Sequence, residues 1–318
     1  MTRKAIVVGS AGQDGQFLCS QLRQRGYEVV GCVREVPASS TSGISEVVVD
    51  IRAQAAVSAL VAGTLPDEVY FLAAFHHSAT DDTGDFSELL SRSLDINTIS
   101  LVNFLQAIRA HSPETRLFYA ASSHVFGHPQ SAVQDERTPI NPVNAYGVSK
   151  AAGLFACRHY RSLGTFASVG ILYNHESELR PAKFVSRKIA RGAAAIKHGH
   201  ATTLTLGNLD AVVDWGYAPD YTDAMQKILQ APHADDFVIA SGKPHTIGEF
   251  ARIAFEAVDL DFTRYVVADG AVVNRNTAAL IGNPAHLIGT TGWRPTADFA
   301  SMVRYLVKHE MASYGANL

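Results

Sequence analysis

The N-terminal strand-turn-helix segment constrains the fold of this chain more than any other feature. Residues 5–8 form a short apolar run that predicts a buried strand, and residues 16–25 have the pattern of an amphipathic helix. Between them stand Gly9, Gly12 and Gly15. Glycine lets backbone amides approach a pyrophosphate at the N-terminus of a helix. Tight turns also need glycine, but the place of this triplet directly after the first strand predicts a dinucleotide-binding turn.

The rest of the first half alternates apolar runs with amphipathic stretches. This alternation favours a parallel sheet with helices on both of its faces. We therefore predict an α/β fold built on a Rossmann-type, doubly wound parallel sheet. Further strands are expected at residues 28–33, 45–49, 68–72, 116–120 and 167–172, and helices at residues 96–110 and 146–162.

Arg34 follows the second expected strand, where many dinucleotide-binding domains carry an acid that binds the ribose 2′-hydroxyl of NAD. An arginine can instead pair with the 2′-phosphate of NADP. The sequence therefore favours NADP, with NAD as the alternative, and an ordinary surface arginine is the competing interpretation. Residues after the third and fourth strands reach the same edge of the sheet. Further cofactor contacts are expected at Asp50, Ile51, Leu72, Ala73 and Ala74.

The regular alternation ends in the second half of the chain, where charged and proline-bearing loops appear. A strand and a helix near residues 214–229 are expected to return to the main sheet. We predict an NADP-binding Rossmann domain at residues 1–173, with a returning segment near 211–241. Residues 174–210 and 242–318 then form a smaller, C-terminal substrate-binding lobe that covers the carboxyl ends of the strands.

The composition excludes several classes of partner. With 318 residues, a formal charge of -3 and a pI near 6.5, the chain has no electrostatic case for binding nucleic acid or an anionic membrane. No stretch approaches the roughly 18 apolar residues of a membrane span. Three cysteines form no CxxC pair, so we expect no disulfide framework and a cytoplasmic protein. The tight histidine pairs, His76-His77 and His198-Gly-His200, lack metal-ligand spacing, so no metal is expected.

Tyr146 and Lys150 carry the clearest chemical signal. They stand at positions i and i+4 of an expected helix and therefore lie on one face of it. There the ammonium can sit beneath the phenol and favour the phenolate, which lowers a pKa that is ordinarily about 10. A tyrosine held in this way can move a proton while a nicotinamide moves a hydride.

Several stretches match one family of enzymes over nearly the whole chain. They are residues 9–15 (GSAGQDG), 174–177 (NHES), 206–210 (LGNLD) and 292–295 (GWRP). Together with the YxxxK pair, they resemble the extended short-chain dehydrogenases/reductases that act on nucleotide sugars, and they are most similar to GDP-mannose 4,6-dehydratases. The GxxGxxG spacing is typical of the superfamily, whereas GQDG and NHES are specific to the dehydratase branch.

The resemblance implies a reaction. Such enzymes oxidise the C4 hydroxyl of a GDP-linked sugar, with the tyrosine as base and NADP+ as hydride acceptor. A glutamate then removes the C5 proton, water leaves from C6, and the hydride returns to C6. The resemblance also implies a homodimer or a homotetramer.

The same resemblance implies roles for residues of this chain. Tyr146 would be the base beside Lys150, and Ser122 would hold the C4 oxygen. Cofactor contacts are implied for Gln13, Asp14, Tyr146, Lys150, His175 and Arg180. Substrate contacts are expected at Ser122, Asn174, Lys188 and Arg275, the last in a C-terminal region suited to a diphosphate.

His124 departs from the family, because it occupies the position of the dehydratase glutamate. A neutral imidazole can take a proton, with an ordinary pKa near 6.5, so His124 is a candidate for the C5 base. The related GDP-fucose synthases carry a cysteine here that works in proton transfer during epimerisation. A histidine that only shapes the pocket is the competing interpretation.

The sequence therefore leaves three functions open. The leading hypothesis is an NADP-dependent nucleotide-sugar dehydratase, which is a lyase. A 4-keto reductase or an epimerase on the same substrate class needs no elimination from C6. The third is a non-catalytic NADP-binding regulator, and the intact Ser122, Tyr146 and Lys150 argue against it because a regulator needs no proton-transfer group.

Overall fold

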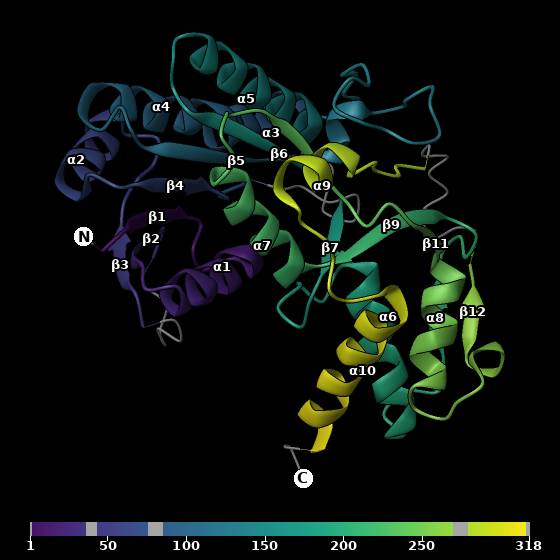
Figure 1. Ribbon diagram of the computed structural model, residues 1–318. Coiled ribbons are helices and arrows are strands. Elements are labelled where there is room, and N and C mark those ends of the chain that lie inside the picture. Colours follow the sequence, from purple (N-terminus) through teal and green to yellow (C-terminus); the bar gives the residue numbers. More distant parts are fainter. Residues whose placement is uncertain (1, 36–42, 76–84, 270–278, 316–318) are drawn as a thin grey trace.

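A seven-stranded parallel sheet forms the centre of the molecule in the computed structural model, which describes residues 2–35, 43–75, 85–269 and 279–315 (Figure 1). The strand order β10-β6-β5-β4-β1-β2-β3 is that of a Rossmann-type doubly wound sheet. Each strand pairs in parallel with its neighbours, so the predicted fold class is confirmed. The strands are β1 (Lys4–Val8), β2 (Glu28–Val33), β3 (Ser45–Val48), β4 (Glu68–Phe71), β5 (Arg116–Ser122), β6 (Ala167–Leu172) and β10 (Asp236–Ile239).

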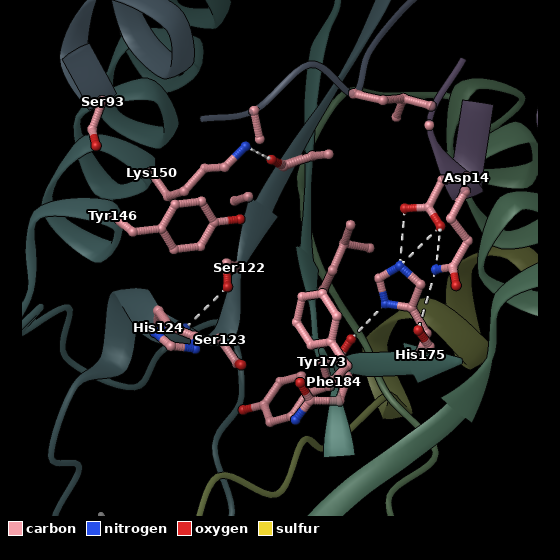
Figure 2. A pocket seen from close by; sticks show the side chains of 18 of the residues that line it. Asp14, Ser93, Ser122, Ser123, His124, Tyr146, Lys150, Tyr173, His175 and Phe184 are labelled. Carbon is pink, nitrogen blue, oxygen red and sulfur yellow. Dashed lines mark hydrogen bonds and ion pairs between the residues drawn. The ribbon is translucent and has the colours of Figure 1, made fainter. Parts of the chain in front are cut away.

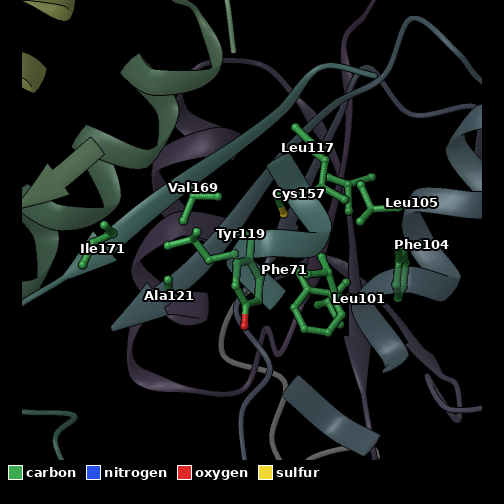
Figure 3. Close-up of a cluster of buried hydrophobic side chains, with 14 of the residues drawn as sticks. Phe71, Leu101, Phe104, Leu105, Leu117, Tyr119, Ala121, Cys157, Val169 and Ile171 are labelled. Carbon is green, nitrogen blue, oxygen red and sulfur yellow. The ribbon is translucent and has the colours of Figure 1, made fainter. Parts of the chain in front are cut away.

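Two hydrophobic cores lie on the two faces of this sheet, because successive side chains of a strand point to opposite sides. In β1, Ile6 belongs to one core and its neighbour Val7 to the other. Figure 3 shows part of the first core, where Phe71 and Phe104 meet edge to face with ring centres 5.8 Å apart. The first face is covered by α2 (Gln54–Thr64), α4 (Ser100–His111) and α5 (Ala145–Ser162), and the second by α1 (Gln13–Gln24), α7 (Ala218–Leu229) and α9 (Ala285–Thr291).

A second group of elements has a hydrophobic core of its own and lies to one side of the main sheet (Figure 1). In this core Trp215 stacks on Phe299 with ring centres 5.7 Å apart. The group contains β7 (Asn174–Glu176), β8 (Leu204–Leu206), β9 (Val212–Tyr217), β11 (Pro244–Thr246), β12 (Val266–Ala268), α6 (Val185–Lys197), α8 (Ile247–Glu256) and α10 (Phe299–Gly315).

The chain returns to the main sheet by a different route from the one predicted. The strand expected near residue 214 is β9, which pairs with β7 and β11, so its predicted return to the main sheet is wrong. The buried Asp214 explains this placement, because its carboxylate accepts hydrogen bonds from the backbone of Ser241 and Gly282. The helix of the predicted passage is α7, which does return and packs on the second core, and β10, also within the predicted segment 211–241, is buried throughout and pairs with β6. The predicted domain boundaries remain a prediction.

The helix expected at residues 96–110 starts earlier than the sequence indicates. It begins as α3 (Phe86–Leu94), capped by Asp85, whose side chain accepts a hydrogen bond from the Ser87 N–H at 3.2 Å. A π-helical turn at Asp95–Ile99 then leads into α4. A π turn shifts the helical register, so the apolar periodicity is continuous only after it.

The glycine-rich turn brings backbone segments together too closely for any side chain. Gly9 has a φ of +92°, and a Cβ there would lie 2.9 Å from the Ala73 backbone nitrogen. A Cβ on Gly15 would lie 2.3 Å from the Gly9 carbonyl oxygen. The turn between β1 and α1 therefore has one backbone arrangement, and it leaves the N-terminus of α1 facing the end of the sheet.

Gly15→Ala tests this packing. Because the new Cβ has no room, we expect the free energy of unfolding to fall by about 1–3 kcal/mol, the usual cost of overpacking. Gly63→Ala is the matched control, since Gly63 also lies in a helix and an added Cβ meets nothing within 4 Å. The control should be unchanged, or more stable by about 0.5–1 kcal/mol. Denaturant titration measures both variants, and equal stabilities would contradict the packing argument.

Candidate functional site

A cavity of about 880 Å³ opens at the carboxyl ends of the central strands (Figure 2). Its walls come from the glycine-rich turn, the ends of β5 and β6, the first turn of α5 and the loop before α6. Parallel α/β sheets bind their ligands at this edge. The cavity brings together the predicted residues Gly9, Gly12, Gln13, Asp14, Gly15, Leu72, Ala74, Ser122, His124, Tyr146, Lys150, Asn174, His175 and Arg180.

Basic side chains outnumber acidic ones around this cavity. Lys150, Arg180 and Lys183 line it. Among the described residues that line it, Asp14 supplies the only carboxylate. A hollow lined by charge of one sign concentrates ligands of the opposite sign, so this cavity suits an anion.

Tyr146 lies in the first turn of α5, with its phenol beside Ser122 (Figure 2). Burial raises the pKa of the phenol to about 12, although a hydrogen bond with Ser122 and the positive charge of Arg180 act to lower it. The structure therefore holds Tyr146 as a neutral phenol that can donate a proton.

The pKa of Tyr146 is raised in this structure, in contrast to the lowering expected from its spacing with Lys150. The amine of Lys150 donates a hydrogen bond to the Ala120 carbonyl at 2.7 Å and lies 5.7 Å from the centre of the Tyr146 ring. The side chain is buried, and burial lowers the pKa of Lys150 to about 7. Desolvation thus opposes the charged form of both groups.

A short 3-10 turn, Ser123–Phe126, follows β5 directly and carries His124 into the cavity wall. The Ser122 hydroxyl oxygen accepts a hydrogen bond from the His124 backbone N–H at 3.3 Å. The His124 and Tyr146 rings meet edge to face, with centres 5.7 Å apart. The fold therefore brings Ser122, His124 and Tyr146 together, and their catalytic roles stay predictions.

A buried ion pair joins the glycine-rich turn to the second group of elements. His175 Nε2 lies 2.9 Å from Asp14 Oδ2, and His175 Nδ1 donates to the Tyr173 carbonyl at 2.7 Å (Figure 2). With an acceptor at each nitrogen, the ring is held as an imidazolium. Gln13 donates a further hydrogen bond to the His175 carbonyl at 3.2 Å. The GQDG and NHES motifs therefore contact each other directly.

The two charges of this pair stabilise each other. Burial alone would raise the pKa of Asp14, but the charge and hydrogen bond of His175 bring it below its usual range. Burial also acts against the charged form of His175, and the Asp14 carboxylate raises the pKa of this histidine above its ordinary value. His175 stacks on Tyr221, with ring centres 4.6 Å apart, which fixes the plane of the imidazole.

Arg180 reaches the cavity from the loop before α6. Its guanidinium carbon lies 3.7 Å from the centre of the Phe184 ring, and its Nε is 3.4 Å from the Glu176 carboxylate. A cation held over an aromatic face keeps its position and its charge. Arg180 is therefore placed to meet an anionic group of a ligand.

Some predicted residues do not line the cavity. The Arg34 side chain is exposed after the end of β2, and Asp50 is exposed and ion-paired with Arg52 at 2.9 Å. Lys188 donates to the Thr205 carbonyl at 2.8 Å from the exposed face of α6, because that face turns away from the cavity. The predicted residues outside the cavity lining are Arg34, Asp50, Ile51, Ala73 and Lys188.

Asn97 supports the site without lining the cavity, and sequence reasoning missed it. The π-helical turn places it behind Tyr146, where its side chain donates to the Ser149 hydroxyl at 2.9 Å. Ser149 in turn donates to the Tyr146 carbonyl at 2.8 Å. A buried asparagine within an apolar helical stretch was the available signal. Asn144, directly before α5, also lines the cavity and is not among the predicted residues.

No group of three or more histidine, cysteine, aspartate or glutamate residues that could hold a metal ion occurs within the described ranges. His198 and His200 both stack on Tyr314, with ring centres 5.4 Å apart in each case. In the part of the chain that the structure describes, every helix is too short or too polar to cross a membrane. The predicted site residue Arg275 and the pair His76-His77 lie outside the described residues.

The Asp14–His175 pair predicts a pH-dependent stability. The pKa of His175 is raised on folding. Its contribution to the free energy of unfolding is therefore fully present below pH 6.5 and is lost as the pH rises through the pKa of His175 in the folded state. On the acid side, the contribution is lost only as the pH falls through the lowered pKa of Asp14. Asp14→Asn should reduce the free energy of unfolding by about 1.5–3 kcal/mol near pH 6, and by less near pH 9.

Denaturant titrations at the two pH values test this prediction. Asp235→Asn is the control, because its pair with His286 is exposed, with side-chain exposures of 53% and 41%. Exposed ion pairs contribute little to the free energy of unfolding, so the stability of this variant should show no such pH dependence. A loss for Asp14→Asn that is the same at both pH values would contradict the ionic nature of the buried pair.

Comparison with known proteins identifies the family. The family model described as GDP-mannose 4,6 dehydratase matches residues 6–306. GDP-mannose 4,6 dehydratase 1 of Arabidopsis thaliana is 34% identical, with 96% of this chain and 89% of that protein covered. GDP-mannose 4,6-dehydratase of Vibrio cholerae is also 34% identical, with 90% and 79% covered.

Solved structures share the fold at low sequence identity. RMD from Pseudomonas aeruginosa, complexed with NADPH, has a TM-score of 0.81 at 24% identity and covers 98% of this chain and 100% of its own. UDP-glucose 4-epimerase from Thermotoga maritima, with UDP-glucose, has a TM-score of 0.84 at 15% identity, with 98% and 99% covered. On the strength of the family model and the curated relatives, the chain belongs to the GDP-mannose 4,6-dehydratase family.

Proposed function

We propose that the chain is an NADP-dependent enzyme that transfers a hydride at C4 of a GDP-linked sugar. The observation that carries this proposal is the presence of Tyr146, Ser122 and the glycine-rich turn in one cavity of about 880 Å³. The excess of basic side chains in this cavity suits a nucleotide diphosphate. The named relatives act on GDP-mannose, and the named structures contain NADPH or UDP-glucose, which supports the same ligand classes.

The residues present fit a dinucleotide. Gly9 and Gly15 let the turn before α1 close tightly on its own backbone, and Gly12 is the N-cap of α1 without a side-chain hydrogen bond. The first backbone N–H groups of α1 can therefore bind a pyrophosphate. Arg34, exposed after β2 and outside the cavity lining, would bind the 2′-phosphate of the adenosine ribose, while Lys150 and Tyr146 would hold the nicotinamide end. When bound, the nicotinamide accepts or supplies the hydride.

Tyr146 moves the proton that accompanies this hydride. Oxidation of the C4 hydroxyl requires a base, and reduction of a C4 ketone requires an acid, and one phenol serves both directions. Ser122, which is hydrogen-bonded to Tyr146, holds the C4 oxygen. Since burial raises the pKa of Tyr146 to about 12, a cationic nicotinamide beside the phenol would favour the phenolate that oxidation needs.

Two kinds of reaction can follow from this C4 chemistry. Dehydration, the reaction that the family resemblance implies, requires a base at C5, and His124 stands at the position of the family glutamate. Reduction of a 4-keto sugar and epimerisation at C4 require no proton removal from carbon. The hydrogen bond between His124 and Asn144 favours the second kind.

Tyr146→Phe tests the proton-transfer role. Removing the phenolic hydroxyl should lower kcat by about 10²–10⁴-fold, the usual contribution of general acid-base catalysis. The dissociation constant for NADP+ should change little, because the hydroxyl is a small part of the binding surface. Tyr160→Phe is the control: it lies on the same helix but outside the cavity and should keep full activity. Unchanged nucleotide-sugar turnover in Tyr146→Phe would favour the non-catalytic, regulatory function.

Product analysis separates the reactions. With GDP-mannose and NADP+, a product lighter by one water in mass spectrometry supports dehydration. Consumption of NADPH with a GDP-linked 4-keto-6-deoxyhexose, and no loss of water from GDP-mannose, supports reduction. Failure of both, with hydride transfer absent for UDP-, CDP- and dTDP-linked sugars as well, would overturn the proposed function.

Arg34→Ala tests the choice of cofactor. Loss of a charge-assisted bond to the 2′-phosphate should weaken NADP+ binding by about 10- to 100-fold and leave NAD+ binding nearly unchanged. Arg25→Ala is the control, because it removes another surface arginine, one that is bound to Asp223 at 2.6 Å. Calorimetric titration measures both affinities. Equal weakening of NAD+ and NADP+ in Arg34→Ala would contradict 2′-phosphate recognition.

A further inference from the structure

Asn144 makes two hydrogen bonds that fix the orientation of its side chain. It is the N-cap residue of α5, and its Oδ1 accepts a hydrogen bond from the Gly147 N–H at 2.7 Å. Its Nδ2 lies 3.3 Å from Nδ1 of His124. If the amide were reversed, the NH2 group would face the Gly147 N–H and the cap would be lost. The NH2 group therefore points at the imidazole.

This orientation determines where the proton of His124 resides. An amide NH2 group offers only donors, so Nδ1 of His124 must be the acceptor. In a neutral imidazole one nitrogen accepts and the other carries the proton. The proton of His124 is therefore on Nε2, and a proton on Nδ1 would face the amide hydrogens of Asn144.

Close backbone packing keeps the two residues in this arrangement. A Cβ on Gly147 would lie only 2.6 Å from the His124 carbonyl oxygen, so the first turn of α5 sits directly on the turn that carries His124. On its other side, the His124 N–H is bound to the Ser122 hydroxyl at 3.3 Å. The backbone of His124 is thus held from both sides.

We propose that Asn144 is a positioning residue that keeps His124 in the Nε2–H form, so that His124 donates a hydrogen bond to a sugar oxygen and does not remove the C5 proton. This inference rests on the proposed C4 chemistry and deepens it. Among the described residues that line the cavity, the one carboxylate, Asp14, is ion-paired with His175. Neither His124 nor a lining carboxylate then supplies a base for C5.

The consequence is a choice of reaction. With His124 as a donor, the position of the family glutamate holds no base for C5, and the cavity favours hydride transfer at C4 alone. In the reductive direction, C4 of a keto sugar gains a hydride from a reduced nicotinamide nucleotide, and Tyr146 donates its proton to the oxygen. The ketone becomes a secondary alcohol, and the nucleotide is oxidised. The substrate class is then a GDP-linked 4-ketohexose, and a dehydratase makes one member of that class, the 4-keto-6-deoxyhexose.

The first test measures the tautomer of His124 directly. Long-range ¹H–¹⁵N correlation spectra distinguish protonated from unprotonated ring nitrogens, and loss of one pattern in His124→Gln assigns His124 among the 13 histidines. We expect Nε2 protonated and Nδ1 unprotonated in the unaltered protein. A pattern with Nδ1 protonated would overturn the proposal, whatever the substrate of the enzyme is.

Two variants of Asn144 keep the helix cap and change only the group that faces His124. Asn144→Asp places a carboxylate oxygen there, which should bring the proton to Nδ1, as in the pairs where a carboxylate orients a catalytic histidine. Asn144→Ser keeps a capping hydroxyl but removes the amide NH2 group that faces Nδ1 of His124, so the preference for Nε2–H should be lost. If both variants keep the original pattern, Asn144 does not position His124.

The second test measures proton exchange at C5 of the sugar. In D2O, the unaltered protein should incorporate no deuterium at C5 of a GDP-linked 4-keto-6-deoxyhexose beyond the uncatalysed rate. Asn144→Asp should incorporate it about 10²-fold faster, because Nε2 becomes an acceptor and His124 a base. Adding His124→Gln to Asn144→Asp should abolish this gain. C5 exchange in the unaltered protein that disappears in His124→Gln would overturn the proposal, whereas absence of C4 hydride transfer in every form would refute the proposed function alone.

Discussion

The buried ion pair between Asp14 and His175 connects the two halves of the cavity. One charge belongs to the turn that begins α1 and the other to the segment that leaves the main sheet after β6. Burying two charges costs more free energy than their attraction returns unless further hydrogen bonds complete the geometry. Here Gln13 and the Tyr173 carbonyl supply those bonds. The pair is favourable only in one arrangement, so it fixes the distance between the glycine-rich turn and the second group of elements.

Most of the main sheet could be predicted from the sequence. Strands buried on both faces are short, nearly continuous apolar runs, and residues 28–33 and 167–172 match β2 and β6 to the residue. The prediction is wrong where contacts between residues far apart in the sequence determine the place of an element. β9 has a strand-like sequence, but hydrogen bonds from Ser241 and Gly282 to Asp214 hold it in another sheet. The start of the helix before residue 96 was missed because a π turn interrupts the periodicity.

The candidate site could be predicted where a short motif fixes the local geometry. It could not be predicted where burial or a contact between distant residues determines a pKa or a hydrogen-bond partner. The motif places Tyr146 and Lys150 on one helical face, but the distance of the amine from the ring and its desolvation follow from the packing of β5 beneath it. Likewise, the sequence shows a histidine at residue 124 and an asparagine at residue 144. Only the capped first turn of α5 reveals that they are bonded, and that bond decides which nitrogen of the imidazole carries the proton.

The path of the chain between the main sheet and the second group of elements has a consequence for recombination. The chain leaves the main sheet after β6, comes back with α7 and β10, leaves again at β11, returns once more as α9 packs on the second core, and ends in α10 against α6. No single crossover point therefore separates the main sheet from the second group of elements. The second group of elements could be exchanged between relatives only as several coordinated segments. Recombination at one junction would remove some of the helices and strands that pack on these hydrophobic cores. Gradual substitution of residues within the cavity is therefore the accessible route to a new specificity.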